Sequence, residues 1–340
     1  MVKDKFLVIG CNSFSGSNFV KDLLLSDYEV LGVSRSDNIK KIFLPFLWES
    51  NIKKFPNGLK NYNFEKIDLN INLPKLISII EIYKPDYIIN LAAQGMVAES
   101  WLSPLDWYQT NVMSQVALHD ELRKMKFIKK YLHVTTPEVY GSTDSGWIKE
   151  NFRFAPSTPY AVSRASCDLH LMSFYKAYNF PVIFSRAANV YGPGQQLYRI
   201  IPRTILSALT GKNMELHGGG ISERAFIHIS DVAKASIKIT LDAKPGTSWH
   251  ISSNQKISIR DLVEKIFYFE KKEDFTKLVK ISKERLGKDQ SYLLDSSKIR
   301  SNFDWNDEIS LENGLKDTFR WIKNNLIIMK TLPWNYEHKT

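Results

Sequence analysis

Short apolar runs alternate with stretches of helical spacing through the first half of the chain, and this alternation limits the fold more than any other feature. The apolar runs, which predict strands, are residues 6–10, 29–34, 64–69, 86–92, 130–135 and 181–186. Apolar residues recur at helical spacing between them, at 17–25, 76–83 and 111–125. Strands that are apolar throughout and separated by helices predict a parallel sheet covered by helices on both faces.

The turn after the first predicted strand has the composition of a phosphate-binding loop. Gly10 and Gly16 occupy the outer positions of a G-x-x-G-x-x-G pattern whose middle position is Ser13. Glycines at such a turn allow the backbone to approach a pyrophosphate at the N-terminus of the following helix. The pattern alone is weak, but its place between the first strand and the first helix indicates a dinucleotide site.

These features predict an α/β protein with a Rossmann-type doubly wound parallel sheet and a smaller C-terminal substrate-binding lobe. The 340 residues, of which 44% are hydrophobic, suffice for one large α/β unit or two lobes. After Asn189 the alternation gives way to loops and shorter elements, ending in a helix over 311–324. We expect residues 1–188 to form the dinucleotide-binding domain, with 225–252 returning to it. Residues 189–224 and 253–340 would form the second lobe.

The end of the second predicted strand bears on the choice between NAD and NADP. NAD-binding forms usually place an acid there for the ribose 2′-hydroxyl, whereas an arginine accommodates a 2′-phosphate. This chain has Arg35 between Ser34 and Ser36, and the nearest acid is Asp37. A guanidinium pairs well with phosphate, so the sequence favours NADP. NAD is the alternative, which holds if Arg35 points only to solvent.

Four polar segments lie where predicted strands end, at 90–94, 135–141, 157–164 and 186–193. Open α/β sheets bind their ligands at the carboxyl ends of their strands. With these motifs the chain resembles the extended short-chain dehydrogenase/reductase superfamily, in its nucleotide-sugar epimerase/dehydratase branch. It is most similar to the sugar-nucleotide 4,6-dehydratases, and the resemblance extends from Phe6 to about Leu326.

The resemblance implies three groups beside the nicotinamide. Thr136 matches the hydroxyl residue of the family, and Tyr160 matches the base that takes the proton from the sugar O4 as hydride leaves C4. Arg164 lies four residues after Tyr160, on the same helix face, where the family has a lysine. An arginine keeps the positive charge but changes the geometry of the donors.

Glu138 implies a dehydratase, because dehydratases place an acid two residues after the threonine to remove the C5 proton. Water is then lost across C5 and C6, hydride returns to C6, and an NDP-4-keto-6-deoxyhexose results. The dTDP-glucose enzymes have an aspartate general acid just before this residue, but this chain has Pro137. The GDP-mannose enzymes also lack that aspartate, and the 90–94 segment and Arg35 match them too. Glu138 would then pass the proton to the leaving hydroxyl itself.

The remaining site predictions concern ligand contacts. Arginines in three segments of the second half, together with an asparagine, resemble the groups that grip the substrate diphosphate in relatives. The substrate-binding prediction is Gln94, Thr136, Glu138, Asn189, Arg199, Arg224 and Arg285. The cofactor-binding prediction is Gly10, Asn12, Ser13, Phe14, Ser15, Gly16, Arg35, Ser36, Asp68, Leu69, Leu91, Ala92, Ala93, Gln94, Thr110, Tyr160 and Arg164.

Two other functions remain open at this point. A 4-epimerase would share the fold and Tyr160 but needs no base at Glu138. The second is a catalytically silent dinucleotide-binding protein, in which Ser13, Pro137 and Arg164 would be traces of lost chemistry. The fold alone does not distinguish an enzyme from such a protein. The joint presence of Thr136, Glu138 and Tyr160 favours the enzyme.

Composition excludes several broader classes. The formal net charge is +10, but Lys and Arg are spread along the chain, so we expect no nucleic-acid partner. The two cysteines are far apart, which fits a reducing compartment, and the histidines and cysteines show no metal-ligand spacing. No apolar run is long enough to cross a bilayer and no signal peptide is evident, so we expect a cytoplasmic protein without membrane contact.

We also expect a homodimer or homotetramer, as in similar proteins. The helix over 111–125 and the helix that begins near Tyr160 are the predicted interface. Leu118, Leu122, Leu169 and Met172 would supply its apolar surface.

Overall fold

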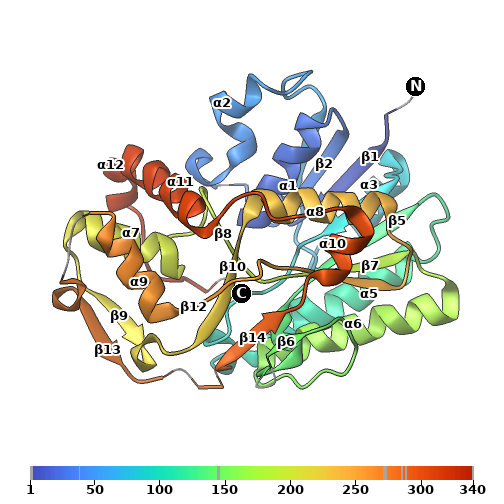
Figure 1. The fold of residues 1–340 in the computed structure, drawn as a ribbon. Coiled ribbons are helices and arrows are strands. Elements are labelled where there is room, and N and C mark those ends of the chain that lie inside the picture. Colours follow the sequence, from blue (N-terminus) through green and yellow to red (C-terminus); the bar gives the residue numbers. More distant parts are fainter. Residues whose placement is uncertain are drawn as a thin grey trace.

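A computed structural model describes residues 3–37, 39–143, 146–270, 274–284, 286–287 and 289–338. Its main feature is a seven-stranded sheet in the order β11-β7-β5-β4-β1-β2-β3 (Figure 1), in which all neighbouring strands are parallel. The strands are β1 (Lys5–Ile9), β2 (Glu29–Ser34), β3 (Tyr62–Lys66), β4 (Tyr87–Asn90), β5 (Lys130–Thr135), β7 (Val182–Ala187) and β11 (Thr247–Ile251). The order reverses between β1 and β4, which is where such sheets form a ligand crevice. The predicted fold class is confirmed.

Helices cover both faces of this sheet because the side chains of each strand alternate between two apolar cores. In β1, Phe6 and Val8 face one core, and Leu7 and Ile9 face the other. The first core is closed by α1 (Phe14–Leu25) and α8 (Ile229–Asp242). The second is closed by α3 (Leu73–Tyr83), α5 (Ser114–Leu122) and α6 (Pro159–Tyr178).

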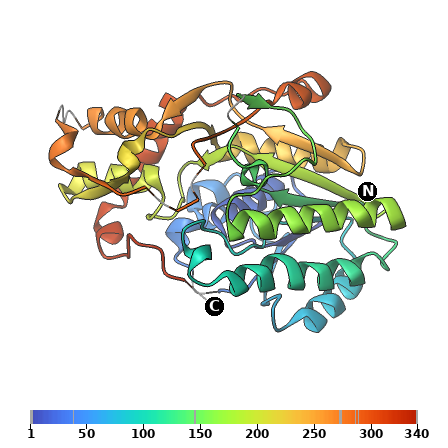
Figure 2. The same ribbon diagram turned by 90° about the horizontal axis from the view of Figure 1, so that it is seen from below.

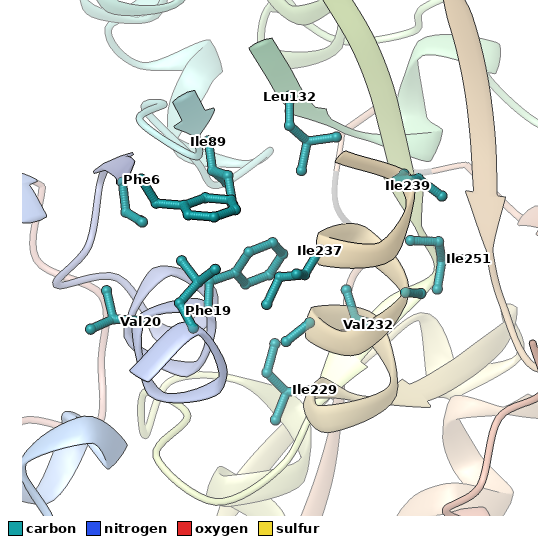
Figure 3. Close-up of a cluster of buried hydrophobic side chains, with 14 of the residues drawn as sticks. Phe6, Phe19, Val20, Ile89, Leu132, Ile229, Val232, Ile237, Ile239 and Ile251 are labelled. Atoms are coloured by element: carbon teal, nitrogen blue, oxygen red, sulfur yellow. The ribbon is translucent and has the colours of Figure 1, made fainter. Parts of the chain in front are cut away.

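Figure 3 shows how α1 and α8 meet over the first core. Phe19 of α1 lies between Phe6 of β1 and Ile237 of α8, and Val232 faces the same space. Phe6 and Phe19 are fully buried. Because α8 is some 200 residues distant from α1 in the sequence, this packing ties the later part of the chain to the first strand–helix unit.

The N-caps of two helices fix the position of the turns that carry functional residues. Ser13 caps α1, its Oγ accepting a 3.0 Å hydrogen bond from the Gly16 amide. Thr158 caps α6 in the same way, with Pro159 at the first helical position. Tyr160 therefore lies in the first turn of α6, next to the carboxyl end of β5.

A second lobe is built from short strands and helices. Its five-stranded sheet joins β12 (Lys256–Ser258), β10 (Glu223–His228), β14 (Ser291–Leu294) and β6 (Trp147–Ile148), with β8 (Asn189–Tyr191) beside β10. A separate pair is formed by β9 (Met214–His217) and β13 (Val279–Ser282). The helices of the lobe are α7 (Ile200–Thr210), α9 (Ile259–Tyr268), α11 (Leu311–Asn324) and α12 (Leu326–Lys330). In contrast, α10 (Ser297–Phe303) packs against β11 of the main sheet. Between β10 and β12 the chain returns to the main sheet, where it forms α8 and β11.

Two predicted elements differ from the observed ones. The stretch 111–125 starts with a π-helical turn, Gln109–Met113 (η4), and only then becomes α5. The strand predicted at 64–69 is β3 at Tyr62–Lys66. It ends earlier because Asp68 forms a turn, its carboxylate accepting a 2.9 Å hydrogen bond from the Asn70 amide.

The apolar residues predicted for a subunit interface divide between the core and the surface. Leu118 and Leu122 are 0% and 1% exposed and belong to the second core, so their assignment to an interface is wrong. Helical spacing identifies an apolar face but not what covers it, and here the sheet does. Met172 is partly buried against the same core, whereas Leu169 is 49% exposed.

Among the described residues, no helix combines the length and apolarity needed to cross a membrane.

Candidate active site

A cavity of about 470 Å³ opens at the carboxyl edge of the sheet, over the reversal between β1 and β4. It is lined by twelve residues of the cofactor-binding prediction: Gly10, Asn12, Ser13, Arg35, Ser36, Asp68, Leu69, Leu91, Ala92, Ala93, Gln94 and Thr110. Segments from four successive strand ends therefore meet at one place. We call this space the dinucleotide cavity.

The glycine turn fits the close approach that a pyrophosphate requires. Gly10 has φ +87°, and a Cβ there would lie 3.0 Å from the Ala92 amide nitrogen. Gly16 does not line the cavity, and a Cβ on it would lie 2.1 Å from the Gly10 carbonyl oxygen. Gly16 thus lets the start of α1 pack against the turn, and the amides of the α1 N-terminus face the cavity, a favourable place for a phosphate. These residues fit a dinucleotide.

Polar side chains line the part of this cavity that lies next to the end of β2. Asn12 Nδ2 donates a 2.7 Å hydrogen bond to the Ser36 carbonyl, which joins the glycine turn to the end of β2. Arg35 Nη2 lies 3.4 Å from Gln94 Oε1. Lys40 also lines the cavity and was not predicted. Two cationic side chains at the end of β2 make this part of the cavity suited to an anionic group.

A larger cavity of about 980 Å³ continues from the first toward the second lobe. Both cavities share Ser13, Arg35, Leu91, Ala93 and Gln94. The larger one is lined by all four predicted catalytic residues and by six of the seven predicted substrate contacts, as well as by Phe14 and Ser15. The seventh substrate contact, Arg285, lies outside the described residues. We call this space the substrate cavity.

The catalytic candidates form one hydrogen-bonded group. The Thr136 hydroxyl donates to a carboxylate oxygen of Glu138. The Tyr160 hydroxyl is hydrogen-bonded to Thr136, and the Tyr160 backbone amide donates a 3.2 Å bond to Ser100 Oγ. Three residues from the end of β5 and the start of α6 are therefore held together, as the motif spacing required.

Burial shifts the acidity of both proton-transfer candidates. Withdrawal from water raises the pKa of Glu138, against the opposing positive charges of Arg224 and Arg199. A raised pKa makes a carboxylate a stronger base, which suits it to removing a proton from carbon. Burial also raises the pKa of Tyr160 and the Glu138 charge raises it further, while the positive charge of Arg164 lowers it. Arg164 thus acts in the direction required of the family lysine.

Arg164 is almost fully enclosed, at 2% exposure. Its Nη2 donates to the Val134 carbonyl, and within the described part of the chain its Nε and Nη1 have no hydrogen-bond partner. A buried guanidinium with unpartnered donors at a cavity wall is costly unless a ligand completes it. Arg164 therefore places a buried positive charge beside Tyr160, where the family lysine would place an ammonium.

The substrate-binding candidates differ in what their side chains do. Asn189 Oδ1 accepts a 3.0 Å hydrogen bond from Tyr292, and its amide nitrogen is buried without a partner among the described residues. Arg224 donates to the carbonyls of Glu223, Gln290 and Asp289, so much of its capacity anchors the 289–290 segment. Arg199 precedes α7 and lines the substrate cavity at the N-terminus of that helix.

Some residues of the site were not predicted. Tyr292 packs under Arg224, with 4.1 Å between guanidinium carbon and ring centre, and lines the substrate cavity. Asn335 and Tyr336 line both cavities, although they follow the last predicted helix. Neither region has a motif, because single aromatic residues in short strands or after a helix carry no local signal of a site.

The fold also gathers His119, His133 and Cys167, which the sequence spacing did not connect. All three are buried, and their potential ligand atoms lie within 4.8 Å of one another. Burial lowers the pKa of His133, Asp168 at 3.2 Å from its Nε2 opposes this shift, and the positive charges of Arg164 and Arg186 add to it. Two neighbouring cations also disfavour a metal ion, so this cluster is best described as a neutral part of the core.

Comparison with known proteins agrees with this geometry. Residues 7–318 match the family model described as GDP-mannose 4,6 dehydratase. The chain belongs to this family. This confirms the resemblance drawn from the motifs, and the match covers both lobes apart from the last residues of the chain.

Relatives of this 4,6-dehydratase family member are similar over almost their whole length. A dTDP-glucose 4,6-dehydratase from Escherichia coli is 28% identical over 348 residues, covering 94% of each chain. The crystal structure of a dTDP-glucose 4,6-dehydratase from Bacillus anthracis in complex with NAD is 30% identical with a TM-score of 0.82, covering 95% of this chain and 97% of the other. That of the Streptomyces venezuelae enzyme with NAD bound is 27% identical with a TM-score of 0.84, covering 94% and 97%. The family member therefore has the fold of an NAD(P)-binding enzyme.

Proposed function

We propose that this protein is a nucleotide-sugar 4,6-dehydratase, which converts an NDP-hexose to an NDP-4-keto-6-deoxyhexose. The observation that carries the proposal is that Thr136, at the wall of the substrate cavity, is hydrogen-bonded both to Glu138 and to Tyr160. A 4-epimerase requires the tyrosine, but it has no use for a carboxylate enclosed beside it.

A bound NAD(P) would accept hydride from the sugar C4 and return it to C6. Tyr160 takes the proton from O4, with Thr136 fixing its hydroxyl and Arg164 favouring its ionised form. Glu138 then removes the C5 proton, which is acidified by the C4 ketone. Pro137 offers no proton, so Glu138 also passes this proton to the hydroxyl that leaves C6 as water. When hydride returns to C6, C5 takes a proton that comes from solvent, and Tyr160 returns the O4 proton to solvent. The raised pKa of Glu138 suits its role as the base.

We propose that the second lobe holds the nucleoside diphosphate. Arg199 and the N-terminus of α7 offer donors to a diphosphate in the substrate cavity, which Asn189 also lines. Arg224 supports this wall and supplies positive charge. This assignment rests on the proposed division into a dinucleotide-binding domain of 1–188 plus 225–252 and a lobe of 189–224 plus 253–340. The structure departs from these bounds at β6, which pairs with β14 in the sheet of the lobe.

Different observations favour NADP and NAD as the dinucleotide. Arg35 and Lys40 at the end of β2 favour a 2′-phosphate and therefore NADP. The solved relatives from Bacillus anthracis and Streptomyces venezuelae have NAD bound, which favours NAD. We propose NAD(P) as the cofactor, and the Arg35 variant described below distinguishes the two forms.

Incubation with a panel of dTDP-, UDP- and GDP-hexoses tests the proposed function. We expect one of them to give a 4-keto product that has lost one water, measured by mass spectrometry and by carbonyl-specific derivatisation. A product of unchanged mass that differs only in the configuration at C4 would assign a 4-epimerase instead. Absence of turnover with every sugar, despite bound dinucleotide, would support a catalytically silent protein.

A further inference from the structure

The last described segment of the chain lies across the dinucleotide cavity. After α12 the chain leaves the second lobe and runs back to the Rossmann domain, as the red trace ending at the C label shows (Figure 2). Leu332, Pro333, Asn335, Tyr336 and Glu337 line this cavity. We call residues 332–338 the C-terminal strap. The family match ends at residue 318, so the strap lies outside it.

The strap is extended and has two different faces. Leu332, Trp334, Tyr336 and His338 are partly buried, whereas the alternating Pro333, Asn335 and Glu337 are exposed. An alternation of this kind is typical of an extended segment that packs along one side. Trp334 holds the near end in the second lobe: its indole donates a 3.1 Å hydrogen bond to the Met329 carbonyl, and its own carbonyl accepts one from Arg203.

The far end is held by Gln94, a predicted cofactor-binding residue at the end of β4. Gln94 Nε2 donates a 3.0 Å hydrogen bond to the Tyr336 hydroxyl and lies 3.1 Å from His338 Nδ1. Its Oε1 accepts from Arg35. The side-chain amide of Gln94 thus joins the strap to the end of β2, directly at the cavity.

His338 completes this attachment. Its Nε2 lies 2.7 Å from an Asp106 carboxylate oxygen, and its ring stacks on Trp107 with 5.0 Å between ring centres and 9° between planes. Asp106 and Trp107 belong to α4 (Pro104–Tyr108) of the Rossmann domain. An imidazole that donates through Nε2 to Asp106 can accept through Nδ1 from Gln94, so one neutral ring satisfies both contacts.

We propose that the C-terminal strap is a binding element for NAD(P), which closes the dinucleotide cavity over the cofactor. On this model the cofactor leaves only after Tyr336 and His338 release Gln94 and Asp106. A dehydratase must retain the reduced cofactor between hydride abstraction and hydride return, and a strap bound on both sides of the cleft provides this retention. The inference rests on the proposed dinucleotide-binding function.

The test is the dissociation rate of bound NADPH or NADH, followed by the loss of cofactor fluorescence after dilution into excess oxidised cofactor. One variant ends at Trp334, which keeps the anchor in the second lobe. A second keeps the full chain and carries Tyr336→Phe with His338→Ala. Tyr268→Phe is the matched control, since Tyr268 is 72% exposed on α9. Thermal unfolding checks that each variant is folded.

We expect both strap variants to release the cofactor roughly tenfold faster or more than the wild type and the control, given the loss of three hydrogen bonds and a stacked ring. An unchanged or slower release from folded variants would overturn the strap proposal while leaving the proposed function intact. A wild-type protein that binds neither dinucleotide would instead contradict the proposed function.

Discussion

At the scale of single residues, the chemistry depends on one partly buried carboxylate. Glu138 accepts a hydrogen bond from Thr136 and lines the substrate cavity, and burial raises its pKa. The residue immediately before it is Pro137, which has no proton to share in the transfer. The arrangement leads to a sharp prediction, because one side chain alone would carry the elimination step.

Glu138→Gln keeps the shape of the side chain but removes the base. We expect hydride transfer from C4 to persist, because that step belongs to Tyr160. Elimination should fall by roughly 10²–10⁴-fold, the usual effect of losing a positioned general base. Reduced cofactor should accumulate with substrate bound, seen by absorbance, and solvent deuterium should no longer enter at C5.

Glu150→Gln is the matched control for this experiment. Glu150 is also a partly buried glutamate whose pKa is raised by burial, but it accepts a hydrogen bond from the His250 amide, away from both cavities. This variant should turn over at the wild-type rate. Full turnover by Glu138→Gln, or a wild type that forms only the C4 epimer, would refute the dehydratase assignment.

At the scale of elements, the cofactor depends on how each strand ends. The loop after β2 brings Arg35 and Lys40 to the dinucleotide cavity, and the turn after β1 brings the α1 N-terminus to the same space. A parallel sheet places these loops at one edge, so residues that are distant in sequence act on one ligand.

Arg35→Asp tests what the end of β2 recognises. If Arg35 binds a 2′-phosphate, wild-type protein should bind NADP more tightly than NAD, and the aspartate should reverse this preference by repelling the phosphate and accepting from the 2′-hydroxyl. Titration calorimetry with both dinucleotides measures the effect. The matched control is Arg320→Asp, on an arginine that is 71% exposed on α11 and lines neither cavity. Wild-type binding of NAD at least as tight as that of NADP would show that Arg35 has no such role.

At the scale of the whole molecule, α5 and α6 lie side by side on one face of the sheet (Figure 2). The apolar side chains that these helices and the preceding turn leave exposed are not the predicted Leu118 and Leu122. They include Met113, 61% exposed, and Leu169, 49% exposed. Exposed apolar groups on adjacent helices favour a helix-to-helix contact with a second copy.

We therefore predict a homodimer through this face. Light scattering at micromolar concentration should give twice the chain mass of 39.3 kDa, or a further multiple of it for a tetramer. Leu169→Glu should shift the equilibrium toward monomer, because a carboxylate would be buried without a partner. Ile82→Glu, at an 84% exposed position on α3, should leave the mass unchanged. A wild-type monomer would contradict the prediction.

The local pattern of the sequence was sufficient to predict the fold class, the family and the grouping of Thr136, Glu138 and Tyr160. Apolar periodicity within about ten residues decides whether a segment suits a strand or a helix, and parallel strands then bring their carboxyl ends together. The glycine turn and the strand-end motifs lie within such short segments. Their relation to one another follows from the sheet, without knowledge of any distant contact.

Contacts between distant segments were decided only in the tertiary structure. The apolar face of α5 is visible in the sequence, but its burial against the sheet is a property of packing. His119, His133 and Cys167 meet because three separate elements converge. The strap bonds to Gln94 across 242 residues of sequence. Spacing along a chain records which side of an element is apolar, while the partner of that side depends on where the rest of the chain folds.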